Sequence, residues 1–157
     1  MIPQSYSAHL TPIFTPRIYG EISSRKSDPD AAETPYVVMF QAIDFLAPGD
    51  IKNIWEFHHP VDAAVLAESA AAGGGVVGLG DGGNDHNLRQ NKCTFKVPHR
   101  GVVHGLAGYF ECVLYKTVEM STRPDTIDLK SKDMISWFPI YFPLKVWFQL
   151  VVAVWRG

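Results

Sequence analysis

The stretch GVVHGLAGYFECVLYKTVE, residues 101–119, decides the fold class of this chain. Valine and aromatic residues recur in it, and such side chains fit the pleated, half-buried surface of a sheet better than a helix. Its strand-like runs are Val102-Val103, Tyr109-Phe110 and Cys112-Val113-Leu114-Tyr115. The stretch therefore predicts β-strands.

Similar runs lie on both sides of this stretch. They occupy residues 36–40, 54–57 and 93–97 upstream, and residues 137–138, 140–142 and 146–148 downstream. Residues 36–40 are expected to form a buried strand, whereas 54–57 and 93–97 alternate apolar and polar side chains, which indicates one apolar face. Short strands separated by proline and glycine predict an all-β fold, an antiparallel barrel or sandwich.

The remaining segments are expected to connect these strands. Residues 2–16 are extended and edge-like, because their prolines have no N–H to give to a strand ladder. Residues 23–34 and 121–132 are polar loops, and residues 47–50 form a turn. Residues 61–87 are a flexible surface insertion. Their alanine-rich first part is compatible with one short helix, and their glycine-rich second part buries too little area to offset its ordering entropy.

Composition indicates one packed domain spanning residues 1–157. A hydrophobic fraction of 46% with 19% charged residues is enough for a core. The net charge is −2 and the Lys and Arg residues are scattered, which argues against a nucleic-acid partner. The apolar segment 135–155 is not expected to cross a membrane, because Pro139, Pro143 and Lys145 interrupt it.

The cysteines and the first residues bear on the cellular compartment. Cys93 and Cys112 lie in strand-like sequence without a CxxC spacing, so buried, reduced thiols are favoured over a single disulfide. Residues 1–4 have neither the basic nor the apolar region of a secretory signal. We therefore expect a cytoplasmic and/or nuclear location.

Motifs for catalysis or cofactor binding are weak. Residues 78–83 satisfy the GxGxxG pattern, but no strand precedes and no helix follows them, so a low-complexity loop is favoured over a nucleotide site. His58 and His59 would point to opposite faces of a strand, which disfavours a shared metal ion. No GxSxG elbow is present. We assign no catalytic, cofactor-binding or metal-binding residue.

Trp137 is the strongest single candidate for a functional side chain. It follows a polar loop and precedes Phe138-Pro139. One interpretation is packing in the core, the usual place of a tryptophan. The other is an aromatic wall that stacks on a guanidinium group. The residues alone leave both open.

Several segments together resemble the C-terminal β-barrel and oligomerisation domain of type II protein arginine methyltransferases, which form symmetric dimethylarginine. The signature is carried by HGLAGYFE at residues 104–111 followed by Leu114-Tyr115, by STRP at 121–124, by SWFPIYFPL at 136–144, and upstream by IPQSY at 2–6 and PYVV at 35–38. The resemblance covers nearly the whole chain apart from the insertion and the last dozen residues.

The resemblance implies a part of an enzyme rather than a complete one. In this family a TIM-type barrel and a Rossmann-type domain that holds S-adenosylmethionine precede the β-barrel, and neither has a counterpart here. We expect no cofactor in this chain and no activity of the chain alone. Expected partners are further copies or other methyltransferase domains, Arg/Gly-rich protein substrates and, in the full enzyme, a WD-repeat propeller.

Site residues are carried over by position. Ser136, Trp137 and Phe138 match the loop whose aromatics contact the substrate arginine. Residues that match subunit contacts of the family are Arg17, Tyr19, Trp55, Phe57, His59 and Pro60.

Two departures from the family pattern carry expectations of their own. The insertion 61–87 falls in the contact region, and Leu144 runs directly into Lys145 where the family has a further strand pair, which predicts an open barrel. The alternatives are a free-standing β-sandwich binding module and a small enzyme that uses the glycine-rich loop.

Overall fold

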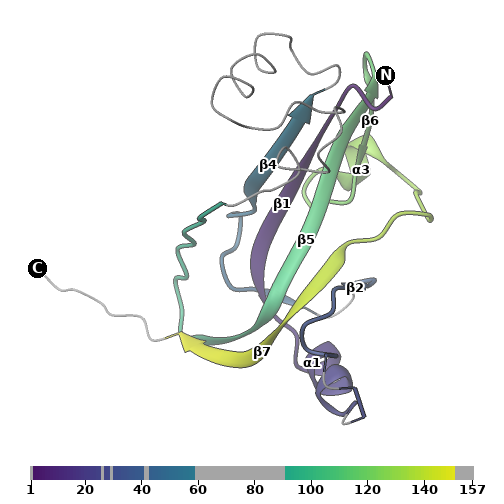
Figure 1. Ribbon diagram of the computed structural model, residues 1–157. Coiled ribbons are helices and arrows are strands. Elements are labelled where there is room, and N and C mark those ends of the chain that lie inside the picture. Colours follow the sequence, from purple (N-terminus) through teal and green to yellow (C-terminus); the bar gives the residue numbers. More distant parts are fainter. Residues whose placement is uncertain (1, 26, 29, 41–42, 59–90, 151–157) are drawn as a thin grey trace, which may run out of the picture.

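The computed structural model describes residues 2–25, 27–28, 30–40, 43–58 and 91–150 (Figure 1). Its strands are β1 Ser5–Phe14, β2 Tyr36–Val37, β3 Asp44–Phe45, β4 Lys52–His58, β5 Gly101–Tyr115, β6 Val118–Ser121 and β7 Ile140–Leu150. Its helices are α1 Pro16–Ser23 and α3 Ile127–Lys130. The expected short helix and flexible loop of residues 61–87 lie outside the described residues.

The described strands form one antiparallel sheet with β5 at its centre. The order is β2-β7-β5-β1-β3, with β4 also paired to β1 and β6 to β5. The β1–β5 register runs from Ser5 opposite Val113 to Ile13 opposite Gly105. The predicted all-β, antiparallel class is confirmed. Within the described residues the sheet stays open, with β4 and β7 on opposite sides of the β1–β5 pair (Figure 1).

The N-terminal strand is extended as predicted, but its expected edge position is wrong. β1 has β5 on one side and β3 and β4 on the other. Pro12 is tolerated there because only its carbonyl is needed: that oxygen accepts a hydrogen bond from the Leu46 N–H at 3.1 Å. A proline whose missing donor is not required does not exclude an inner strand.

The core lies on one face of the sheet. Ile13 of β1, Ala107 of β5 and Tyr141 of β7 are fully buried there, and Ile22 of α1 packs into the same cluster. The Tyr141 hydroxyl donates a hydrogen bond to the His104 carbonyl at 2.8 Å. Gly105 lies so close to the Tyr141 ring and the Phe142 carbonyl that a Cβ at this position would overlap both. Burial of this shared face, rather than strand length, fixes the register of β5 and β7.

Several local predictions differ from the structure. Residues 16–23 form helix α1, which begins with Pro16 in its first turn, a favoured place for proline. Residues 36–40 contribute only the two-residue strand β2, and Val37 in it is exposed. Residues 93–97 alternate in burial as expected but pair with none of the described strands, and the expected strand at 137–138 is irregular. The loop 121–132 contains the single turn of α3.

Cys93 and Cys112 are both free and half-buried, so the expected thiol form is found, but the expected full burial is not. Among the residues that the structure describes, no helix has the length and apolar character needed to cross a membrane.

Candidate functional site

The residues predicted to contact an arginine lie on an irregular segment between α3 and β7. Ser136 and Trp137 are exposed, with 56% of Trp137 accessible to solvent, and Phe138 is half-buried. The Trp137 ring meets the Phe110 ring edge-on, with 5.7 Å between the centroids and 74° between the planes. The indole is therefore anchored at one edge to β5 and is not enclosed in the core.

A groove adjoins Trp137. It has a volume of about 340 Å³ and takes its walls from the segment 39–45, from β5 and from the segment 122–139. Its lining residues are Met39, Phe40, Ile43, Phe45, Tyr109, Thr122, Pro124, Ile127, Met134, Trp137, Phe138 and Pro139. Most of these side chains are apolar, and the tryptophan face supplies the kind of surface on which a planar guanidinium stacks.

Hydrogen bonds of the backbone and of the Thr122 hydroxyl tie the walls of this groove to the sheet. The Thr122 N–H donates to the Phe110 carbonyl at 2.9 Å, and the Phe110 N–H donates to Thr122 Oγ1 at 2.9 Å. On the other side, the Val38 N–H donates to the Pro139 carbonyl at 3.0 Å. The segment that carries Trp137 is thus tied at Thr122 to strand β5 and at Pro139 to Val38, the residue after β2.

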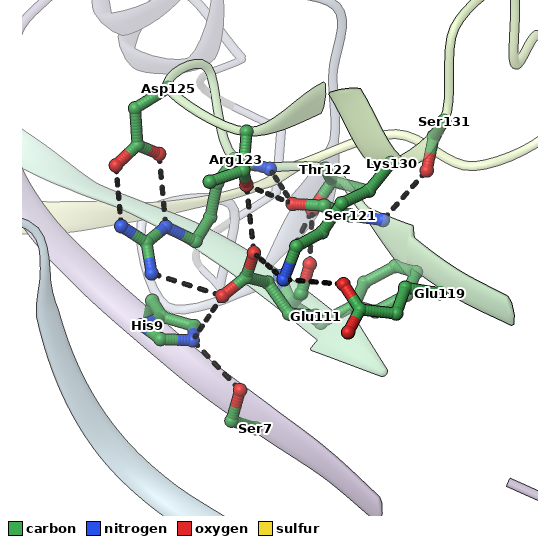
Figure 2. A network of polar contacts seen from close by, with 12 residues as sticks. Ser7, His9, Glu111, Glu119, Ser121, Thr122, Arg123, Asp125, Lys130 and Ser131 are labelled. Atoms are coloured by element: carbon green, nitrogen blue, oxygen red, sulfur yellow. Dashed lines mark hydrogen bonds and ion pairs between the residues drawn. The ribbon is translucent and has the colours of Figure 1, made fainter. Parts of the chain in front are cut away.

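A charged network lies beside the groove (Figure 2). The Glu111 carboxylate contacts Arg123 Nη1 at 3.0 Å, Lys130 Nζ at 3.1 Å and the Thr126 hydroxyl at 2.7 Å. Arg123 also forms a two-pronged pair with Asp125. Burial raises the pKa of Glu111, but the hydrogen bonds from Thr126 and Lys130 together with the positive charges of Arg123 and Lys130 outweigh it, so this pKa lies below its usual range.

Two histidines are buried, His9 beside the charged network and His104 beside the start of α1. His9 of β1 is 4% exposed, and its Nε2 lies 2.8 Å from Ser7 Oγ and 3.6 Å from Glu111. His104 of β5 stacks between Phe14 and Tyr19, with ring centroids 4.8 and 4.7 Å away. Its Nδ1 accepts a hydrogen bond from the Thr15 N–H at 3.1 Å, at the start of α1. Burial lowers the pKa of both rings, and the positive charge of Arg123 adds to the effect at His9.

These lowered pKa values predict that stability falls on mild acidification. The unfolded chain takes up protons near pH 6.5, whereas the folded chain resists protonation until lower pH. Below about pH 6.5 protons therefore favour the unfolded state, and the free energy of unfolding decreases until the folded-state pKa values are passed. The midpoint of urea unfolding should be lower at about pH 5.5 than at about pH 7.5. Most carboxylates are ionised at both of these pH values, so they contribute little to the difference.

The matched variants are His9→Gln and His104→Gln. Each should flatten this pH dependence in proportion to the proton uptake that it removes. A wild-type chain that is more stable at the lower pH would contradict the assignment.

The predicted subunit-contact residues fall into two groups. Arg17 is exposed on α1, 3.3 Å from Glu21, and Tyr19 is half-buried against His104. Trp55 and Phe57 lie on β4, opposite Ala8 and Tyr6. Because α1 follows the last residue of β1 whereas Phe57 pairs near its first, the two groups lie at opposite ends of that strand. His59 and Pro60 lie outside the described residues.

The sheet face opposite the core carries a second apolar hollow. It has a volume of about 350 Å³ and lies between β4, β1, β5 and β7. Ile140 and Phe142 line it and are 37% and 36% exposed. The indole Nε1 of Trp55 is buried and has no hydrogen-bond partner among the described residues. This face is left incompletely covered by the part of the chain that the structure describes.

Comparison with known proteins identifies what the chain is similar to. The profile of the PRMT5 oligomerisation domain matches residues 5–153. Protein arginine N-methyltransferase skb1 of Schizosaccharomyces pombe is 40% identical over 148 residues, which cover 92% of this chain and 21% of that protein. Protein arginine N-methyltransferase 5 of Oryza sativa subsp. japonica is 34% identical over 147 residues, covering 92% and 19%. The Xenopus laevis protein of the same name is 34% identical over 148 residues, covering 92% and 20%. The chain thus spans about a fifth of the length of these relatives.

Proposed function

The chain belongs to the PRMT5 oligomerisation domain family, and from this we propose that it provides subunit contacts and an arginine-contacting wall to a protein arginine methyltransferase. The match over residues 5–153 carries the proposal, together with relatives whose names state that activity. Methyl transfer to form symmetric dimethylarginine, and the binding of S-adenosylmethionine, are assigned to parts of such an enzyme outside this chain. The same proposal includes a WD-repeat propeller as a partner of the full enzyme and a cytoplasmic and/or nuclear location.

Self-association is the first part of this function. Its support is the family of the domain and the incompletely covered apolar face around Ile140 and Phe142. Apolar patches rimmed by polar residues are commonly sites of protein contact. Arg17, with 71% of its side chain exposed on α1, is a contact residue by its position in the family pattern.

We expect the chain to form dimers or larger species at micromolar concentration. Arg17→Glu should raise the dissociation constant about tenfold, because reversing a charge at a contact surface removes its electrostatic complementarity to the partner. Sedimentation equilibrium over a range of concentrations measures this. Lys132→Glu, a charge reversal at an exposed position far along the chain, is the matched control and should leave the constant unchanged. A wild-type chain that stays monomeric throughout would refute this part of the proposal.

Contact with a substrate arginine is the second part. Its support is the exposure of Trp137, its edge-on anchoring by Phe110 and the apolar groove beside it. A guanidinium can lie flat on the free indole face while the alkyl stem of the arginine packs along the apolar wall. Calorimetric titration of the chain with an Arg/Gly-rich peptide tests the contact directly, with the same peptide carrying lysine for arginine as the control.

A further inference from the structure

The segment 121–131, which leads to Trp137, is held to the sheet by a cluster of polar contacts. Helix α3, which lies in this segment, buries no side chain, and Leu129 is 87% exposed. Arg123 and Lys130 both contact the Glu111 carboxylate (Figure 2). The Thr126 hydroxyl donates a hydrogen bond to the same carboxylate. The carboxylate thus contacts residues near the start, in the middle and near the end of the segment 121–131.

Glu111 is also adjacent in sequence to the residue on which Trp137 rests. Phe110 gives its ring to the indole and both of its backbone groups to Thr122. The Ser121 hydroxyl accepts the Arg123 N–H at 3.0 Å, and the Ser131 hydroxyl accepts the Ser121 N–H at 2.7 Å, so the turn is closed on itself as well. Phe110, which contacts the indole, and Glu111, which holds the segment 121–131, are therefore neighbours on β5.

From this arrangement we propose that Glu111 is a positioning residue for Trp137. By holding the segment 121–131, its carboxylate fixes where the following Ser136-Trp137 enters the groove and keeps the indole edge on Phe110. The inference rests on the proposed contact between Trp137 and a guanidinium. Glu111 itself lines no wall of the groove beside Trp137. Its effect on ligand binding is exerted through the indole.

The test uses the whole chain with Glu111→Gln, which keeps the side-chain size but removes the charge that attracts Arg123 and Lys130. The probe is N-acetyl-arginine methylamide, whose dissociation constant should rise about fivefold, since oriented contacts of this kind are commonly coupled by such factors. Glu119→Gln is the matched control, because Glu119 contacts Lys130 but not Arg123 or Thr126. It should change the constant less than about twofold.

Two further readouts separate positioning from a general loss of structure. In a Trp137→Ala background, Glu111→Gln should have no additional effect on probe binding. In ¹H–¹⁵N spectra, the indole N–H signal of Trp137, assigned with Trp137→Phe, should shift or broaden in Glu111→Gln while that of Trp55 stays in place. A Trp137 signal and a dissociation constant that are both unchanged would overturn the inference.

The same data distinguish failure of this inference from failure of the proposed function. If the wild-type chain does not bind the probe, the arginine contact is wrong, and the indole signal alone decides whether Glu111 positions Trp137. If Glu111→Gln does not fold, Thr126→Val decides by the same readouts, because it removes the hydroxyl contacts of Thr126 with Glu111 and Ser121 and leaves the pair of Glu111 with Arg123.

Discussion

Tyr141→Ala should lower the free energy of unfolding by about 3–5 kcal/mol, the range for removing a large buried aromatic side chain. The ring is fully buried in the core cluster and fills the space above Gly105. Glycine has no side chain that could fill this space when the ring is removed. Phe40 approaches it edge-on at 6.4 Å and loses that contact. The cavity would lie between β5 and β7, so their pairing is weakened at its best-packed point.

Urea unfolding followed by circular dichroism measures the change, and the matched variant is Tyr141→Phe. That variant keeps the ring and removes only the hydrogen bond to the His104 carbonyl, so it should cost about 1–2 kcal/mol. Equal losses for the two variants would mean that the hydroxyl rather than the ring stabilises this part of the sheet. A loss below about 1 kcal/mol for Tyr141→Ala would place Tyr141 outside the stabilising core.

Trp137→Ala should weaken binding of an arginine-containing peptide about tenfold while lowering the free energy of unfolding by less than about 1 kcal/mol. A partly desolvated cation–π contact is worth about 1–2 kcal/mol, which corresponds to this loss of affinity. The small effect on stability follows from the 56% exposure of the residue and from the edge-on geometry of its ring contact with Phe110. Separation of the two effects is what distinguishes a ligand-binding residue from a core residue.

Calorimetry and urea unfolding of the same samples provide both numbers. Trp137→Phe retains an aromatic face and should lose less affinity than Trp137→Ala, and Ile135→Ala, at a neighbouring position that is 81% exposed, should lose none. In an enzyme that contains this domain, kcat/KM for a protein substrate should fall in parallel with the affinity. Unchanged affinity with a large loss of stability would return Trp137 to the role of packing.

The fold class followed from residues 101–119 because their composition and alternation report burial against a sheet. The same pattern at residues 93–97 predicted a strand that does not form: alternating burial is present there, but backbone pairing is not, and only pairing makes a ladder. Pro16 is compatible both with an extended segment and with the first turn of a helix, so this residue does not reveal helix α1.

Trp137 could be singled out as a candidate from the sequence, whereas the network that surrounds its segment could not be predicted. SWFPI at residues 136–140 has a recognisable family pattern, and Trp137 in it is 56% exposed. Glu111 and Arg123, in contrast, are common residue types twelve positions apart. Only the hairpin of β5 and β6 brings them together, and the sequence gives no direct measure of that register.

The open sheet has a consequence for the symmetry of any assembly. Among the described strands, β4 on one side and the part of β7 beyond Phe142 on the other have no ladder partner on their outer sides. If the β4 edge of one copy joined the β7 edge of the next, every added copy would leave a new free strand edge, and growth would have no natural end. Contact of like surfaces across a two-fold axis would instead close after two copies. A single sharp mass in solution would therefore indicate isologous contact, and a ladder of masses would indicate a heterologous one.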